Sequence, residues 1–192
     1  TIYTCIISDA QGCYDTVSYS LLQPEQLQTT IDLVNPVACF GESSGKIKAE
    51  AQGGNTPPPY TYAWNNGVST SNNNNIIAGN YVVVVTDNKG CSDTAEITLV
   101  EPTVLSVAIS ESDVTCFGSD DGEITATPSG GTPEPGIPPT YYYLWDDAAS
   151  QTTPTATDLS PDVYTVTITD ANGCTVTSQT VNISGPTNEL VV

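Results

Sequence analysis

The sequence has no histidine, no arginine and only three lysines, against 22 acidic residues in a chain of 192. Without histidine, no histidine-dependent pair of nucleophile and base can be assembled. The formal net charge of −19 opposes binding to nucleic acid or to an anionic membrane, so neither is an expected partner. The chain also lacks an initiator methionine, a signal peptide and a long apolar run. We therefore expect an excerpt from a longer or processed protein, with no membrane insertion in this segment.

What the sequence does contain is an internal repeat with a period near 80 residues. The triplet Cys-Phe-Gly occurs at 39–41 and 116–118, and the motif Asp-x-x-Gly-Cys ends at Cys13, Cys91 and Cys174. This period is too long for a solenoid repeat and matches a small domain that buries its own core. We predict the C-terminal strands of a preceding repeat at 1–25, a first complete repeat at 26–102, a second complete repeat at 103–186, and the start of a further repeat at 187–192.

The residue types of both complete repeats are those of β structure, with Val, Ile, Thr and Tyr interrupted by Gly, Pro, Asn and Asp. In the first complete repeat, strands are predicted at 27–34, 46–52, 60–64, 81–87 and 92–100, with weaker ones at 68–70 and 75–77. In the second, they are predicted at 104–110, 123–128, 141–145, 164–170 and 175–183. The predicted fold class is all-β: tandem immunoglobulin-like β-sandwich repeats with short linkers.

Each complete repeat has one tryptophan, Trp64 or Trp145, at the end of a stretch in which aromatic residues alternate. Alternating residues share one face of a strand. A row of aromatics can form a sugar-stacking platform, but a single Trp per domain at strand spacing favours a place in the core. We predict that both tryptophans are core residues.

Six cysteines without histidine and without a Cys-x2-Cys pair do not indicate zinc. Two cysteines at equivalent positions of each complete repeat indicate a disulfide framework in an oxidising compartment. We predict one bridge within each repeat, Cys39 with Cys91 and Cys116 with Cys174. Each bridge closes a long loop, which the chain-entropy model values at about 4 kcal/mol.

Two cysteines fall outside this scheme. Cys13 is equivalent to Cys91, so its partner is expected upstream of residue 1. Cys5 is equivalent to Val83 and Val166. Either Cys5 is a buried apolar substitute for valine, or it bonds Cys13; the first interpretation is preferred.

Acidic residues supply the remaining candidates for chemistry. Calcium needs six to eight oxygen ligands, and the acidic turn with Asp120, Asp121 and Glu123 is the best local candidate for such a site. The alternative, an ordinary polar turn, is the preferred interpretation. A pair of carboxylates serves glycoside hydrolysis, and Asp120–Asp121 or Asp146–Asp147 could be considered. Neither pair recurs in the first complete repeat, and neighbours on a strand point to opposite faces. We therefore expect no catalytic residues, no enzyme activity and no cofactor other than Ca²⁺.

Two threonines are candidates for glycosylation. Thr16 and Thr94 each follow an aspartate and precede an aliphatic residue, and they occupy equivalent positions. Sugars at the edge of a sheet would also block edge-to-edge pairing of strands. We predict O-linked glycans on these two residues.

Taken in order, the motifs resemble a known family. They are Cys-Phe-Gly, an acidic stretch with Gly, Gly-Gly, Tyr-x-Tyr-x-Trp, Asp-x-x-Gly-Cys and a closing Pro, and they cover almost all of 26–186 and a fragment in 1–25. This pattern resembles the SprB-type repeat of giant gliding adhesins on the surface of Bacteroidota, and the wider group of PKD-like and immunoglobulin-like surface modules. The resemblance implies an extracellular, surface-attached adhesin for gliding motility, exported by type IX secretion, with repeats that form a filament. It carries no catalytic residues.

We therefore expect a non-catalytic structural or adhesive stalk segment of a secreted cell-surface filament or giant adhesin. Its partners would be neighbouring repeats or subunits of the same filament, and many copies would multiply weak contacts, including contacts with surface polysaccharide. One alternative is a carbohydrate-binding accessory module of a secreted polysaccharide-degrading protein, with exposed tyrosines at 141–143 as its binding face. Another is a self-assembling extracellular fibre subunit, because the two strands of 1–25 are only marginally stable alone.

Overall fold

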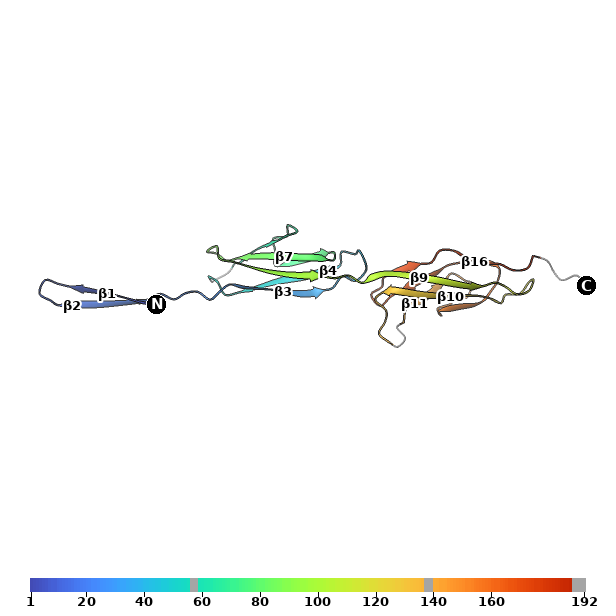
Figure 1. Ribbon diagram of the computed structural model, residues 1–192, viewed down its shortest axis with the longest axis horizontal. Coiled ribbons are helices and arrows are strands. Elements are labelled where there is room, and N and C mark those ends of the chain that lie inside the picture. Colours follow the sequence, from blue (N-terminus) through green and yellow to red (C-terminus); the bar gives the residue numbers. More distant parts are fainter. Residues whose placement is uncertain (56–58, 137–139, 188–192) are drawn as a thin grey trace, which may run out of the picture. The chain divides into compact units, whose positions relative to one another are not determined.

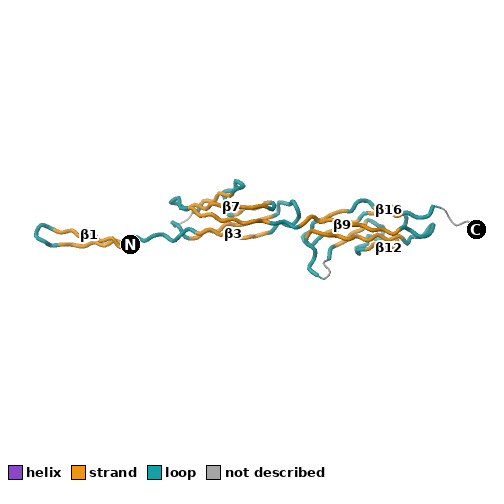
Figure 2. The backbone as a smooth tube through the Cα atoms, viewed as in Figure 1, coloured by secondary structure: helices purple, strands orange, loops and turns teal. Residues whose placement is uncertain are grey.

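The computed structural model describes residues 1–55, 59–136 and 140–187. These residues form β-strands joined by turns and loops, and no helix occurs among them, so none of them forms a helix able to cross a membrane (Figures 1 and 2). The all-β prediction is confirmed. The predicted start of a further repeat lies almost entirely outside the described residues, as do parts of the two proline-rich loops.

The first complete repeat consists of two three-stranded sheets, with strand orders β3-β4-β6 and β5-β7-β8. Their bounds are β3 Gln28–Asn35, β4 Gly45–Gln52, β5 Thr61–Trp64, β6 Asn72–Ile76, β7 Gly79–Thr86 and β8 Ser92–Leu99. The five strands predicted with most support are present with shifts of one or two residues at their ends. The weak strand predicted at 68–70 is absent, because these residues form a loop.

The second complete repeat has the same two sheets, β12-β10-β9 and β11-β14-β15, and a short additional pair, β13-β16. The bounds are β9 Thr103–Ser112, β10 Gly122–Gly131, β11 Tyr142–Trp145, β12 Thr155–Leu159, β13 Asp162–Tyr164, β14 Val166–Thr169, β15 Thr175–Thr177 and β16 Val181–Ile183. The strand predicted at 164–170 is interrupted at Thr165, whose N–H and hydroxyl both donate to the Asp146 carboxylate at 2.8 Å. The sequence pattern gave no sign of β12.

The core of the second complete repeat lies between its two sheets. Ile124 and Ala126 on one sheet meet Trp145, Val166 and Ile168 on the other, and all five are buried. Among the described residues, those of this cluster all fall within 105–183, which places them in the second complete repeat. The two-sheet, immunoglobulin-like sandwich predicted from the alternation is confirmed.

Both tryptophans are core residues, as predicted. Trp64 is 4% and Trp145 2% exposed. Their indole N–H groups donate to the carbonyl oxygens of Thr70 and Thr153, both at 2.9 Å. Each ring therefore fills a core and has its one polar atom satisfied, which leaves no face for stacking on a sugar.

The chain divides into two compact units with boundaries unlike those of the sequence repeats. The first unit comprises 1–32, 48–73 and 81–97, and the second comprises 33–47, 74–80 and 98–192. Residues 33–47, which carry the first Cys-Phe-Gly triplet, therefore belong to the same unit as the second complete repeat.

Residues 1–25 contain an antiparallel hairpin, β1 Ile2–Ser8 paired with β2 Tyr14–Ser20. Every residue of both strands is exposed. Tyr3 and Ile7, for example, are 59% and 68% exposed, whereas Tyr81 and Val85 at the equivalent positions are buried. The hairpin thus has the sequence of core strands without a core of its own.

Candidate functional site

Each Asp-x-x-Gly-Cys motif is a turn built around its aspartate. In the first complete repeat, the backbone N–H groups of Lys89 and Cys91 donate to Asp87 Oδ1 at 2.8 and 3.0 Å. Asn55 donates to Asp87 Oδ2 through its backbone N–H at 2.8 Å and its side chain at 2.9 Å. Four hydrogen bonds therefore converge on one buried carboxylate and join the turn to the loop that follows β4.

The same turn recurs around Asp170. Backbone N–H groups of Asn172 and Cys174 donate to its Oδ1, both at 2.9 Å, and Thr132 donates to its Oδ2 at 2.8 Å. The aspartate fixes the position of the cysteine that ends the motif. We call this element the aspartate turn.

The Gly-Gly motif lies against the aspartate turn. Gly54 and Gly131 have φ of +67° and +60°. A Cβ on Gly54 would lie within 3 Å of Asp87 Oδ2, and one on Gly131 within 3 Å of Asp170 Oδ2. A side chain on Gly130 would collide with the backbone carbonyl of Val104. Glycine is therefore required both for the backbone conformation and for the close approach of two chain segments.

The hydrogen bonds perturb the first of these carboxylates. The backbone and side-chain N–H groups of Asn55, together with the backbone N–H groups of Lys89 and Cys91, hold the pKa of Asp87 far below its usual range. Donors directed at the ionised form favour it. Asp87 is thus a permanent anion at neutral pH with its acceptor sites occupied, which suits a structural role and not a general base.

The structure contains a disulfide between Cys39 and Cys174, with a Cα–Cα distance of 5.7 Å and a sequence separation of 135 residues. The predicted pairings of Cys39 with Cys91 and of Cys116 with Cys174 are therefore wrong. The cysteines of the Cys-Phe-Gly loop and of the aspartate turn do form a bridge, but it joins the first complete repeat to the second.

The length of the first strand explains this correction. In the second complete repeat, Cys116 follows the C-terminal end of β9, whereas the aspartate turn of Cys174 is bonded to Thr132, next to the residue paired with Thr103 at the start of β9. Ten strand residues span about 33 Å, far beyond the 4.4–6.8 Å usual for bridged Cα atoms. The two cysteines of one repeat therefore lie at its opposite ends.

The other four cysteines, Cys5, Cys13, Cys91 and Cys116, are free and exposed. Cys5 is therefore neither buried, which the sequence had favoured, nor bonded to Cys13. The reason is that β1 and β2 have no sheet packed against them among the described residues, so the position that Val83 and Val166 occupy in a core is open here.

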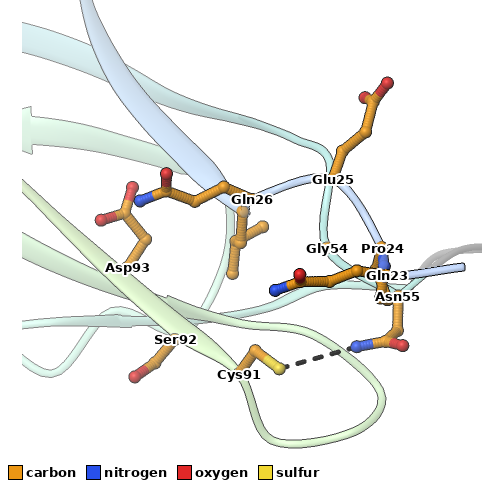
Figure 3. A pocket seen from close by; sticks show the side chains of 10 residues that line it. Gln23, Pro24, Glu25, Gln26, Gly54, Asn55, Cys91, Ser92 and Asp93 are labelled. Atoms are coloured by element: carbon orange, nitrogen blue, oxygen red, sulfur yellow. Dashed lines mark hydrogen bonds between the residues drawn. The ribbon is translucent and has the colours of Figure 1, made fainter. Parts of the chain in front are cut away.

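Cys91 borders a pocket of about 380 Å³ in the first unit (Figure 3). It is lined by the segment from Gln23 to Leu27, by Gly54 and Asn55, and by residues 91–93. The Asn55 side-chain amide lies 3.6 Å from Cys91 Sγ. The pocket thus exposes a thiol beside the aspartate turn.

The acidic turn that was the candidate for a calcium site does not assemble a ligand set among the described residues. Asp120, Asp121 and Glu123 are all exposed. The hydroxyl and the backbone N–H of Thr115 donate to Asp121 and lower the pKa of its carboxyl. No cluster of three Cys, Asp or Glu side chains suited to a metal ion occurs in 1–55, 59–136 or 140–187. Asp121 therefore serves to shape the loop that carries Cys116.

The two candidate glycosylation sites lie on strands. Thr16 is exposed on β2, and Thr94 is exposed on β8, the edge strand of its sheet. Asp93, which precedes Thr94, accepts a 2.7 Å hydrogen bond from the Thr29 backbone N–H. Glycosylation of both threonines stays a prediction, and the exposure of both hydroxyl-bearing residues is compatible with it.

The tyrosines at 141–143 do not form one exposed face. Tyr141 and Tyr143 are half-buried against the core, and the Tyr141 hydroxyl donates to the Gly130 carbonyl at 2.9 Å. Tyr142 alone is exposed, at 58%, and its hydroxyl donates to Glu134. This arrangement lacks the aromatic platform that the carbohydrate-binding alternative requires.

Comparison with solved structures returns proteins of the immunoglobulin type at low similarity. One, described as the structural basis for Dscam isoform specificity, is 13% identical with a TM-score of 0.38, and the match covers 96% of this chain and 54% of the other. The chain thus spans about half the length of that protein. The amphioxus IgVJ-C2 molecule is 13% identical with a TM-score of 0.31, covering 85% of this chain and 98% of the other.

No curated protein matches the chain. The family model of the SprB repeat matches twice, over 33–69 and 108–150. Each match begins in the first strand of a complete repeat and includes its Cys-Phe-Gly loop, its Gly-Gly motif and its tryptophan. The resemblance seen in the motifs is confirmed: two segments of the chain, one in each complete repeat, match the model of the SprB repeat.

Proposed function

We propose that this chain is a non-catalytic structural or adhesive segment of a filament on the cell surface. The observation that carries the proposal is the pair of SprB-type repeats joined by the Cys39–Cys174 bridge. A disulfide is stable in an oxidising compartment, which accords with an extracellular location. Mechanically, a bridge between successive repeats adds a covalent connection to a stalk under tension.

The recognisable motif residues also support a structural role. The aspartates, glycines and tryptophans that define the repeat hold its own turns and core. A catalytic centre would instead direct such groups into an open cleft. The finer assignment, an adhesin of gliding motility exported by type IX secretion and carrying glycans, belongs to this proposal and comes from the family resemblance.

Surface labelling of the producing cells tests this function. Antibodies raised against the 192-residue chain should label intact, unpermeabilised cells and should reduce their attachment to glass or polysaccharide. Antibodies against a cytoplasmic protein serve as the control for cell integrity. Label confined to permeabilised cells, or unchanged attachment under saturating surface label, would contradict the surface and adhesive roles respectively.

A self-assembling fibre subunit is a second candidate, favoured by the exposed apolar residues of the β1–β2 hairpin. Val17 and Tyr19, for example, lie on one face of the hairpin and are 66% and 70% exposed. Contiguous exposed apolar surface is typical of an interaction site. Sedimentation velocity of the chain over a range of concentrations tests this candidate: a fibre subunit forms an increasing series of oligomers, and a lone segment stays monomeric.

A further inference from the structure

We propose that Cys91 and Cys116 each form a disulfide with an adjacent SprB-type repeat of the same polypeptide, in the way that Cys39 bonds Cys174. Cys91 would bond the cysteine of a Cys-Phe-Gly loop in the repeat before it. Cys116 would bond the cysteine of an aspartate turn in the repeat after it. This goes beyond the proposed function, because it concerns how repeats are joined and not what they adhere to.

The bridge that is present defines the contact. Beside the Cys39–Cys174 bond, the Asn172 side chain donates to the Ala38 carbonyl at 2.9 Å and to Thr132 Oγ1 at 3.1 Å. The aspartate turn around Asp170 therefore positions both its cysteine and an amide that binds the backbone of the incoming loop. The contact is local, because it involves one aspartate turn and one Cys-Phe-Gly loop.

The first complete repeat has the same receiving turn, and its cysteine is unbridged. Asp87 holds the N–H of Cys91 as Asp170 holds that of Cys174. The Cys91 thiol is free and borders the 380 Å³ pocket. At the position equivalent to Asn172 stands Lys89, whose ammonium group is also a donor for a carbonyl. The first complete repeat thus has a counterpart of the aspartate turn, of its cysteine Cys174 and of the side-chain donor Asn172.

The second complete repeat has the same donating loop. The N–H three residues after the cysteine donates to its carbonyl at 3.1 Å in both loops, from Glu42 to Cys39 and from Ser119 to Cys116. Gly41 and Gly118 both have positive φ, +72° and +76°. The Cys116 thiol is therefore presented on a loop of the same shape as the one that carries the bonded Cys39.

A second hydrogen bond fixes the shape of both Cys-Phe-Gly loops. The N–H before the cysteine donates to a side-chain oxygen six residues later, from Ala38 to Ser44 at 2.8 Å and from Thr115 to Asp121 at 3.0 Å. The proposal thus assigns a role to the acidic turn of the second complete repeat: Asp121 shapes the loop that donates Cys116. Cys5 has no counterpart in either complete repeat and is the internal negative control.

Formation of each bond is a two-electron oxidation. Two thiols lose two protons and two electrons and form one S–S bond. The electrons pass to a disulfide oxidant, such as oxidised glutathione in vitro, which is reduced to two thiols. The exposed thiols of Cys91 and Cys116 are accessible to the mixed disulfide through which this exchange proceeds.

The test extends this chain by one repeat. Residues 187–192 are replaced by a second copy of 103–186, and the protein is refolded in a glutathione redox buffer and alkylated. The unextended chain keeps four thiols. We expect the extended chain also to keep four, because Cys116 bonds the appended counterpart of Cys174, and peptide mapping without reduction should recover that linked pair. Six thiols, with Cys116 alkylated, would overturn the proposal.

Matched variants exclude non-specific oxidation. In the extended chain, Cys116→Ser should leave the appended turn cysteine alkylated, whereas Cys5→Ser should leave the new bridge intact. Loss of the bridge in the Cys5 variant, or a linked pair that includes Cys5, would contradict the assignment. Native protein from the producing cells, alkylated before lysis and mapped in the same way, keeps the proposal testable if the appended repeat fails to fold.

In the native protein, Cys91 should be recovered bonded to a Cys-Phe-Gly peptide, and reduction should leave the mass of the polypeptide on a denaturing gel unchanged. Alkylated Cys91 and Cys116, or a band that falls to a smaller mass on reduction because separate molecules were joined, would refute it. Attachment of cells is scored separately, so failure of the adhesive function and failure of the bridge are distinguishable.

Discussion

The aspartate turn uses a charged residue to shape the backbone. Asp9, Asp87 and Asp170 each accept hydrogen bonds from the N–H groups two and four residues later. In the hairpin, where the other described residues leave the turn exposed, Asp9 still makes both bonds at 2.9 Å. The turn is therefore encoded locally, and the contact to Asn55 or Thr132 is added when a complete repeat folds.

The caged Asp87 predicts a pH dependence of stability. Because its folded pKa is depressed, its contribution is fully present above the unfolded value of about 3.9 and is lost as the pH falls through the folded pKa. Asp87→Asn places an amide donor toward Asn55, so it should lower the free energy of unfolding at pH 7. Chemical denaturation from about pH 7 to about pH 2.5 should show the difference shrinking below about pH 4. A constant difference would contradict this.

The Gly-Gly motif predicts a large cost for a single methyl group. Gly130→Ala introduces a Cβ that collides with the Val104 backbone, whereas Gly173→Ala has a similar φ, +83° against +77°, and open space around it. Both should lose about 1–2 kcal/mol from the positive φ. Gly130→Ala should lose about 1–3 kcal/mol more from the collision. Urea denaturation measures both, and equal losses would show that the close approach is not limiting.

Among the strands, β6 shows where composition misleads. The sequence predicts only a weak strand at 75–77, and four consecutive asparagines at 72–75 are typical of a polar turn. The strand in fact runs over Asn72–Ile76, and Asn73 is completely buried. Its side chain exchanges hydrogen bonds of 3.1 and 3.2 Å with Asn66. Strand propensity reflects fit to a half-buried surface, and here the paired amide supplies that fit.

This pair predicts an asymmetry within the asparagine run. Asn73→Ala removes both hydrogen bonds to Asn66 and, at about 0.5–1.5 kcal/mol for each, should lower the free energy of unfolding by about 1–3 kcal/mol. Asn74→Ala, on the exposed neighbour, should change it by less than about 0.5 kcal/mol. Denaturation of the two variants side by side checks this, and similar losses would remove the role of the amide pair.

The strands that alternation predicts, such as β7 and β11, were predictable because burial follows a period of two along them. The pairing of the cysteines was not predictable from the sequence. Cys39 and Cys116 are equivalent, as are Cys91 and Cys174, so their spacing fits bridges within a repeat and between repeats equally well. Only the length of β9, which keeps the two cysteines of one repeat apart, decides between them. The Thr132–Asp170 contact, which places Cys174 near the start of β9, joins residues 38 apart in the sequence and leaves no pattern there.

At the scale of the whole molecule, charge is the unbalanced quantity. The chain has three lysines against 22 acidic residues. One of the lysines, Lys48, forms a 2.7 Å ion pair with Glu50. Repulsion among the remaining carboxylates destabilises the folded chain.

Salt should therefore stabilise this protein. Raising sodium chloride from about 0.05 M to about 1 M shortens the Debye length to about 3 Å and should raise the Tm measured by calorimetry at pH 7. At about pH 3, where most carboxylates are protonated, the gain should be smaller. A Tm that falls with salt at neutral pH would show that carboxylate repulsion does not limit stability.

The Cys39–Cys174 bond also changes what a protease can do. Its two ends enclose 134 intervening residues, since they are 135 apart in sequence. A single cut anywhere among them, including the short junction between the complete repeats, leaves both fragments in one covalent piece. Separating the fragments therefore requires both hydrolysis of the backbone and reduction of the disulfide.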